Sequence, residues 1–167
     1  MSAIRQKESR TANSFVEKIF MNKLVLVAAM ALFASAQLKA QKAEVFSASS
    51  QAIRGYDPVA YFTEGKPVKG VKDFMYRWND ASWYFSSKAN LDSFTKNPEK
   101  YAPQYGGYCA YGCSEGHKAP TDPNAWTIID GKLYFNYSLK VKELWVKNTG
   151  ERIAQADKIW PTIKDKE

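Results

Sequence analysis

Cysteine and histidine are scarce in this chain of 167 residues, which contains two cysteines and one histidine. All three lie within residues 106–117, at Cys109, Cys113 and His117. Their Cys-x3-Cys-x3-His spacing matches no zinc-finger, haem-attachment or thioredoxin signature. Any thiol chemistry or soft-metal ligation in this protein must therefore come from this one segment.

The sequence also lacks the common catalytic motifs. It has no G-x-S-x-G, no phosphate-binding P-loop and no H-E-x-x-H. A nucleophilic pair of Cys113 and His117, four residues apart on a helix, is conceivable, but no residue to orient the histidine is evident. The sequence leaves open whether the protein is an enzyme and favours a binding role.

An excess of positive charge is missing from most of the chain. The net charge is +7, but residues 1–40 hold six of the 24 basic residues and two of the 17 acidic ones. The remaining 18 basic and 15 acidic residues give residues 41–167 a net charge of about +3. A nucleic-acid-binding protein needs a strongly basic, clustered face, so we expect no nucleic-acid partner.

No apolar run is long enough to span a membrane. The longest, residues 24–33, follows Lys23 and precedes Ala34-Ser35-Ala36, whereas a spanning helix needs about 20 apolar residues. A charged residue, a short apolar run and an A-x-A site form a secretory signal peptide. We assign it to residues 21–40, with cleavage after Ala36 or, as an alternative, after Ala40.

The predicted signal peptide implies an exported protein, periplasmic or extracellular, with no membrane anchor in its mature form. Residues 1–20 are polar and precede Met21. They are interpreted as an upstream extension, although a long charged region of the signal is the alternative. Residues 41–52 are small and polar without periodicity, which predicts a flexible spacer before a domain over residues 53–163.

Alternating residues and turn signals predict two β-hairpins. One pairs residues 74–78 with 83–85 across Asn79-Asp80. The other pairs residues 126–129 with 133–137 across Asp130-Gly131, which is typical of a type I′ turn.

Capping residues predict short helices between and after these hairpins. Asp57 precedes a helix over 58–62, Ser86 or Ser87 precedes one that carries Leu91 and Phe94, and Ser138 precedes one that ends at 148–150. A last helix is predicted from about Glu151 and stops before Pro161. The predicted fold is a small single α+β domain, in which antiparallel hairpins are packed by short helices and two helices lie at the C-terminus.

Several motifs resemble those of the secreted YHS-domain proteins of bacteria. The motifs are G-Y-D-P-V-A-Y-F at 55–62, W-Y-F-S-S at 83–87, N-P-E-K-Y at 97–101, Y-G-G-Y-C-A-Y at 105–111, D-G-K-L-Y at 130–134 and N-Y-S at 136–138. The resemblance spans about residues 53–161. YHS domains are similar to TRASH domains, which bind metals through cysteines. The matching positions here are Val59 or Ala60, Ser86 and about Asn90, so the resemblance does not carry that metal site over.

Any metal site must instead use Cys109, Cys113 and His117. On a helix the two cysteines would share a face with Cβ atoms about 5–6 Å apart, whereas a disulfide needs about 3.8 Å. Two thiolates and an imidazole suit copper(I) or zinc(II). His117 could join them only if the helix ended near Gly116 and the chain folded back.

Three interpretations of the segment remain open. The first is binding of copper or zinc, or of another small ligand, by Cys109, Cys113 and His117. The second is a disulfide between Cys109 and Cys113, because cysteines in exported proteins commonly pair; it would either staple the fold or serve a thiol–disulfide or other small enzyme. The third is inert packing of buried thiols.

Export provides a first test of the sequence analysis. We expect the mature protein to begin at Gln37 or Gln41, because signal peptidase cuts after the small residues that follow the apolar run. Intact mass and N-terminal sequencing of protein recovered from the periplasm or medium measure this. Recovery of the uncleaved chain from the cytoplasm would contradict it.

Overall fold

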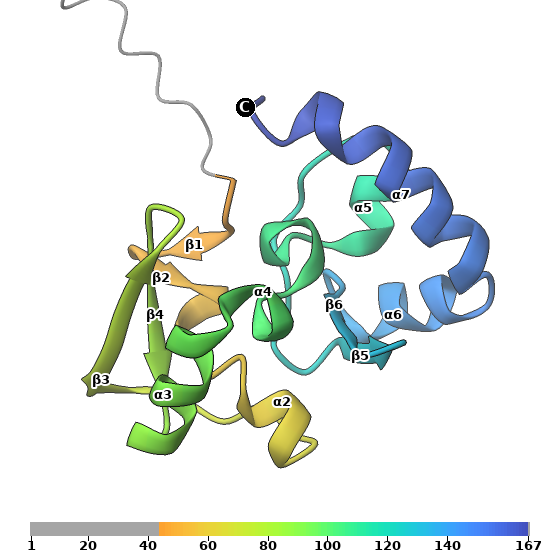
Figure 1. Ribbon diagram of the computed structural model, residues 1–167. Coiled ribbons are helices and arrows are strands. Elements are labelled where there is room, and N and C mark those ends of the chain that lie inside the picture. Colours follow the sequence, from red (N-terminus) through yellow and green to blue (C-terminus); the bar gives the residue numbers. More distant parts are fainter. Residues whose placement is uncertain (1–43, 167) are drawn as a thin grey trace, which may run out of the picture. The chain divides into compact units, whose positions relative to one another are not determined.

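The computed structural model describes residues 44–166 (Figure 1). The predicted signal peptide at 21–40 and the extension at 1–20 lie outside the described residues. In chain order the elements are β1 (Ser47–Ala48), β2 (Gln51–Ala52), the 3₁₀ turn η1 (Ile53–Gly55), α2 (Ala60–Thr63), β3 (Val71–Trp78), β4 (Ala81–Phe85), α3 (Lys88–Lys96), α4 (Pro98–Tyr101), the 3₁₀ turn η2 (Gln104–Gly107), α5 (Ala110–Ser114), β5 (Trp126–Ile129), β6 (Lys132–Phe135), α6 (Leu139–Val146) and α7 (Thr149–Ile163). The predicted α+β class is confirmed. None of the helices within 44–166 has the length and apolar character needed to cross a membrane.

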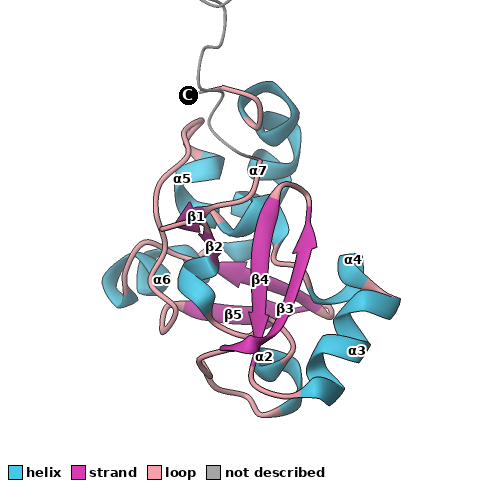
Figure 2. Cartoon of the chain, turned by 90° about the vertical axis from the view of Figure 1, so that its left-hand side faces the viewer, coloured by secondary structure: helices cyan, strands magenta, loops and turns pink. Residues whose placement is uncertain are grey.

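The larger sheet has the strand order β1-β2-β4-β3. Strands β3 and β4 form the predicted hairpin, with Tyr76 opposite Trp83 and Trp78 opposite Ala81. Asn79 and Asp80 turn the chain with φ of 47° and 57°. Figure 2 shows α3 and α4 beside this hairpin. Strand β3 begins three residues earlier than predicted, since its first residues are exposed and carry no alternating pattern.

The second hairpin joins β5 and β6 as predicted, although β6 ends at Phe135 rather than at residue 137. Trp126 lies opposite Phe135 and Ile129 opposite Lys132. Asp130 and Gly131 have φ of 50° and 73°, the left-handed values that a type I′ turn requires at both positions. Figure 1 shows α5, α6 and α7 gathered beside this hairpin.

Two clusters of buried side chains make up the core, and β6 contributes to both. Leu133 and Phe135 belong to the first cluster, with Trp83 and Phe94, whereas Tyr134 belongs to the second. Neighbouring side chains of a strand point to opposite faces, so one strand separates the clusters. The second cluster also contains Tyr105, Tyr108, Cys113, Trp145 and Ile163. Most of the aromatic rings are therefore packed in the hydrophobic core.

The described part of the predicted spacer is folded rather than flexible. Val45 and Phe46 are buried, with exposed fractions of 2% and 8%, and β1 and β2 join the sheet. The backbone N–H of Phe46 donates to the carbonyl of Gly106 at 2.9 Å. A Cβ on Gly106 would lie 1.8 Å from the carbonyl oxygen of Glu44, so only glycine allows this contact. The prediction failed because two-residue strands have no periodicity to detect.

The last helix differs from its prediction at both ends. Helix α7 begins at Thr149, two residues early, and continues through Pro161 to Ile163. Trp160 and Ile163 pack in the second cluster. Because most helical stability in a protein comes from packing of an apolar face, this burial keeps the last turn helical although proline removes one backbone hydrogen bond.

A buried carboxyl group joins the starts of α2 and α3. The side chain of Asp57 is fully buried. Its Oδ1 accepts hydrogen bonds from the backbone N–H groups of Val59 at 2.8 Å and Ala60 at 3.3 Å. Its Oδ2 accepts from the N–H of Ser86 at 2.8 Å, the Ser86 hydroxyl at 2.7 Å and Asn90 Nδ2 at 2.7 Å. Both oxygens are thus satisfied. The helix predicted over 58–62 begins instead at Ala60, and Val59 is its N-cap residue. Asp57 accepts from the backbone at this helix start and connects two helices that are distant in sequence.

Replacing Asp57 should destabilise the fold strongly. The variant Asp57→Ala leaves several buried donors without an acceptor, so we expect the free energy of unfolding to fall by about 3 kcal/mol. Urea denaturation measures this. Asp92→Ala is the control, because it removes only the exposed ion pair with Lys88 and should cost no more than about 0.5 kcal/mol. Equal losses for the two variants would contradict the role assigned to Asp57.

Candidate thiol and metal site

The cysteines lie at the start of the short helix α5, where the chain turns sharply. Tyr105, Gly106 and Gly107 all have positive φ and precede this helix. The Tyr105 hydroxyl donates to Asp157 Oδ1 at 2.8 Å, which ties the turn to α7. The N–H of Cys109 donates to the carbonyl of Ala119 at 3.0 Å. The segment is therefore held from both sides.

Cys109 is the N-cap of α5, and its sulfur faces several backbone donors. Its Sγ accepts from the N–H of Gly112 at 3.4 Å. Burial raises the pKa of the Cys109 thiol, while the backbone N–H groups of Gly112, Tyr137 and Tyr111 act in the opposite direction. Donors directed at sulfur stabilise a thiolate more than a thiol. Cys109 thus sits in a dry site that favours the thiol overall, and the backbone donors offset part of the cost of forming a thiolate.

Cys113 follows one turn later and is fully buried. Its N–H donates to the carbonyl of Cys109 at 2.9 Å, and its side chain belongs to the second core cluster. Burial raises the pKa of its thiol to about 12; nearby Cys109 also raises it, and Lys118 lowers it. Both cysteines are free in the structure. At neutral pH the pair is therefore protonated.

His117 folds back onto α5, as the three-ligand interpretation requires. Gly116 has φ of 88°, and the N–H of His117 donates to the carbonyl of Gly112 at 3.1 Å. The imidazole Nε2 lies 3.3 Å from the point that a Cβ on Gly112 would occupy. The imidazole is nevertheless exposed, whereas both thiols are buried.

The three predicted ligands do not gather into one group. Within residues 44–166, no set of three or more histidine, cysteine, aspartate or glutamate residues is placed to hold a metal ion. The structure brings Cys109 and Cys113 together on one helical turn and leaves His117 at the surface beside Gly112.

Asn136 is the residue of this site that sequence reasoning missed. It follows β6 and is fully buried. Its Oδ1 accepts from the N–H of Tyr111 at 3.3 Å and from the Cys109 thiol at 3.8 Å. Its Nδ2 has no hydrogen-bond partner among the described residues. Asn136 appeared in the sequence only as the end of a predicted strand and as part of the N-Y-S motif at 136–138.

One family model matches part of the chain. The family model described as the YHS domain matches residues 59–105, which span α2, the β3–β4 hairpin, α3, α4 and the start of η2. No curated protein and no solved structure matches the chain. The cysteines begin four residues after the matched region, so this match does not assign them a role.

The residues that donate hydrogen bonds to the Asp57 carboxyl group lie within the matched region, at the positions that the resemblance aligned with cysteines of TRASH domains. Val59, Ala60, Ser86 and Asn90 all donate to the Asp57 carboxyl group. Hydrogen bonds to one buried side chain therefore connect these positions in this protein.

The buried thiol of Cys113 should make stability depend on alkaline pH. Its pKa rises from an ordinary value of 9.0 to about 12 on folding. Between these pH values the folded state keeps a proton that the unfolded state loses. The contribution of the thiol to the free energy of unfolding is therefore fully present below pH 9 and is lost as the pH rises toward 12. We expect Cys113→Ala to make this fall shallower, measured by urea unfolding across that range.

Ile163→Val is the matched control for this measurement. Ile163 packs in the same cluster and does not titrate, so its replacement should lower stability equally at every pH. Burial also raises the pKa of several tyrosines, which adds to the pH dependence of stability, and these tyrosines are retained in both variants. An unchanged pH slope in Cys113→Ala would contradict the assigned burial of the thiol.

Proposed function

We propose that this protein binds a soft transition-metal ion through Cys109 and Cys113, with copper(I) as the preferred ion. The match of residues 59–105 to the YHS domain supports this proposal. The predicted signal peptide supports a place of action in the periplasm or outside the cell. The ion is cargo in this proposal, and the protein is a binding protein rather than an enzyme. The association of YHS and TRASH domains with metals supports the class of ligand.

The observation that carries the proposal is the pair of free thiols at the start of α5. They lie one turn apart, and the Cys109 sulfur faces backbone N–H groups that stabilise a thiolate. Thiolates select soft ions such as copper(I). Copper(I) is satisfied by two thiolates, which this pair can supply.

Zinc ranks below copper because of its coordination number. Zinc takes four ligands in structural sites. It would require His117 to leave its place beside Gly112, together with a fourth donor. His117 remains a candidate auxiliary ligand at the surface end of α5.

Protons set the pH dependence of the proposed binding. Both thiols must lose their protons before they bind a metal, and burial raises the pKa of each. Affinity for copper(I) should therefore increase as the pH rises. The N–H groups of Gly112, Tyr111 and Tyr137 reduce the cost of forming the Cys109 thiolate.

Copper(I) titration against a chromogenic chelator tests the proposal. We expect one copper(I) per chain in the reduced protein, and a loss of affinity of more than about 100-fold in Cys109→Ser and Cys113→Ser. His117→Ala should retain copper(I) within about threefold if the imidazole is auxiliary. Ser114→Ala, which alters the neighbouring position of the same helix, is the matched control and should bind as the unaltered protein does.

Two results would contradict the proposal. One is the absence of copper(I) binding by the reduced protein. The other is a native mass two hydrogens below the reduced mass with slow reduction, which would identify a disulfide between Cys109 and Cys113 instead.

A further inference from the structure

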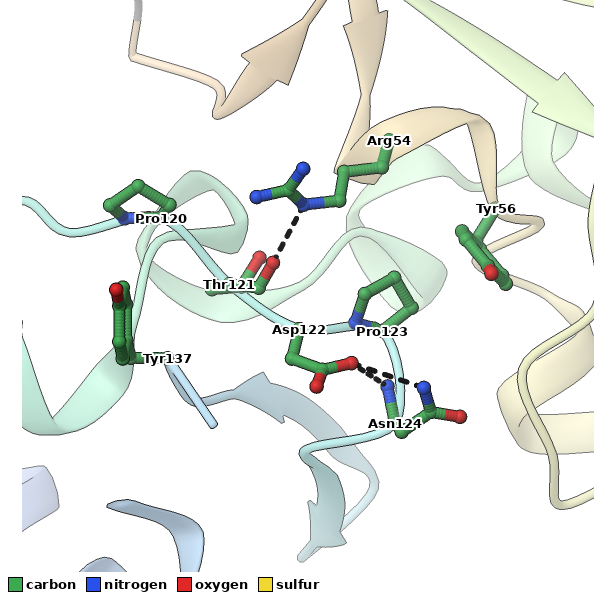
Figure 3. A pocket seen from close by; sticks show the side chains of 8 residues that line it. All are labelled: Arg54, Tyr56, Pro120, Thr121, Asp122, Pro123, Asn124 and Tyr137. Atoms are coloured by element: carbon green, nitrogen blue, oxygen red, sulfur yellow. Dashed lines mark hydrogen bonds between the residues drawn. The ribbon is translucent and has the colours of Figure 1, made fainter. Parts of the chain in front are cut away.

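A pocket of about 480 Å³ opens between η1 and the loop that follows α5. Figure 3 shows the side chains that line it, with Tyr56 and Tyr137 on opposite sides and Arg54 and Asp122 between them. The lining is Arg54, Tyr56, Pro120, Thr121, Asp122, Pro123, Asn124 and Tyr137. The pocket includes none of the thiol residues, so it is a separate candidate site.

Arg54 presents a fixed cation to this pocket. Its Nε donates to the carbonyl of Thr121 at 2.9 Å, and its guanidinium lies 5.5 Å from the centre of the Phe46 ring. The two terminal nitrogens make no hydrogen bond to other described residues, and Figure 3 shows them projecting away from Tyr56. A planar guanidinium with free donors fits the paired oxygens of a carboxylate.

Asp122 presents a fixed anion to the same pocket. Its Oδ1 accepts from the backbone N–H of Asn124 at 2.9 Å and from Asn124 Nδ2 at 3.1 Å. The second carboxylate oxygen accepts no hydrogen bond from another described residue. It is therefore available to a donor on a ligand, and an ammonium group is the donor that a carboxylate binds most strongly.

The loop that carries Asp122 is held in place before any ligand binds. The N–H of Asp122 donates to the carbonyl of Asn136 at 3.0 Å. The Thr121 hydroxyl donates to a carbonyl of η2 at 3.1 Å, and the Tyr61 hydroxyl donates to the carbonyl of Pro123 at 3.0 Å. A site whose groups are already fixed binds with a smaller loss of entropy.

Two tyrosine rings give the pocket apolar walls. Tyr137 is 58% exposed, which is unusual for an aromatic ring in a chain whose other rings mostly form the core. The ring of Tyr56 carries Lys69 Nζ 4.4 Å from its centre, and the same Nζ donates to the carbonyl of Arg54 at 2.6 Å. These contacts position the Tyr56 ring and the turn that carries Arg54.

We propose that this pocket binds a small zwitterion of the α-amino-acid type. The carboxylate of the ligand pairs with the terminal nitrogens of Arg54, its ammonium group pairs with the free oxygen of Asp122, and its side chain lies between Tyr56 and Tyr137. A simple anion would meet the opposing charge of Asp122, and a simple cation would meet Arg54. A ligand with both charges satisfies both groups.

Titration of the full-length mature protein with each of the twenty L-amino acids, followed by two-dimensional amide NMR, tests this proposal. We expect at least one to bind with a dissociation constant of about 1 mM or lower, with shifts centred on residues 54–56 and 120–124. Its N-acetyl derivative and its decarboxylated amine should each bind at least about tenfold more weakly, because each lacks one charge.

Single substitutions test the contributions of the two charged side chains separately. Arg54→Gln should weaken binding of the amino acid by about tenfold or more, and Asp122→Asn should do the same. Arg77→Gln is the control, because Arg77 is an exposed arginine on β3 whose ion pair with Asp80 is long, at 4.0 Å. The same spectra show whether each variant is folded. These titrations measure binding of the amino acid without any metal, so the outcome is independent of the metal proposal.

Three outcomes would overturn the inference. One is no binding of any amino acid at about 10 mM, ten times the expected constant. Equal binding of the N-acetyl derivative, with no effect of Asp122→Asn, would identify an anion site instead. Equal binding of uncharged sugars would identify a carbohydrate surface.

Discussion

The carboxyl group of Asp57 is the constraint on which the rest of the structure depends. A buried polar group costs free energy unless it is hydrogen-bonded, and Asp57 accepts five hydrogen bonds from the starts of α2 and α3. These bonds fix the two helices that flank the β3–β4 hairpin and so define the region that matches the YHS domain. The junction also positions part of the first core cluster, because Tyr61 and Phe94 lie on those two helices.

Asn136 links the second half of the molecule in a similar way. Its side chain contacts Cys109 and the backbone of α5, while its carbonyl accepts from Asp122 in the loop of the pocket. The thiol pair and the pocket are therefore attached to one buried residue at the end of β6. The two proposed sites are chemically separate, yet they share this support.

Local signals made much of the fold predictable. Ser87 and Ser138 cap α3 and α6, and Asp130-Gly131 forms the expected turn, since these features depend on a few neighbouring residues. The strands at 47–52 and the continuation of α7 through Pro161 depend on tertiary packing, which a local pattern does not contain. For the candidate site, the sequence spacing predicted that Cys109 and Cys113 share one helical turn. It also predicted that His117 could approach them only if the chain folded back after Gly116. Burial of the thiols, exposure of the imidazole and the role of Asn136 arise from distant segments and could not be read from spacing.

The division of the core by β6 has a consequence for how this domain tolerates change. Leu133 and Phe135 serve one cluster and Tyr134 the other, so displacement of the strand by one position would exchange the residues supplied to both clusters at once. The two-residue turn at Asp130-Gly131 sets the register of β5 and β6 and therefore fixes which β6 side chains enter each cluster. Insertions that a surface turn elsewhere would accept should be excluded here, although the turn itself is exposed to solvent.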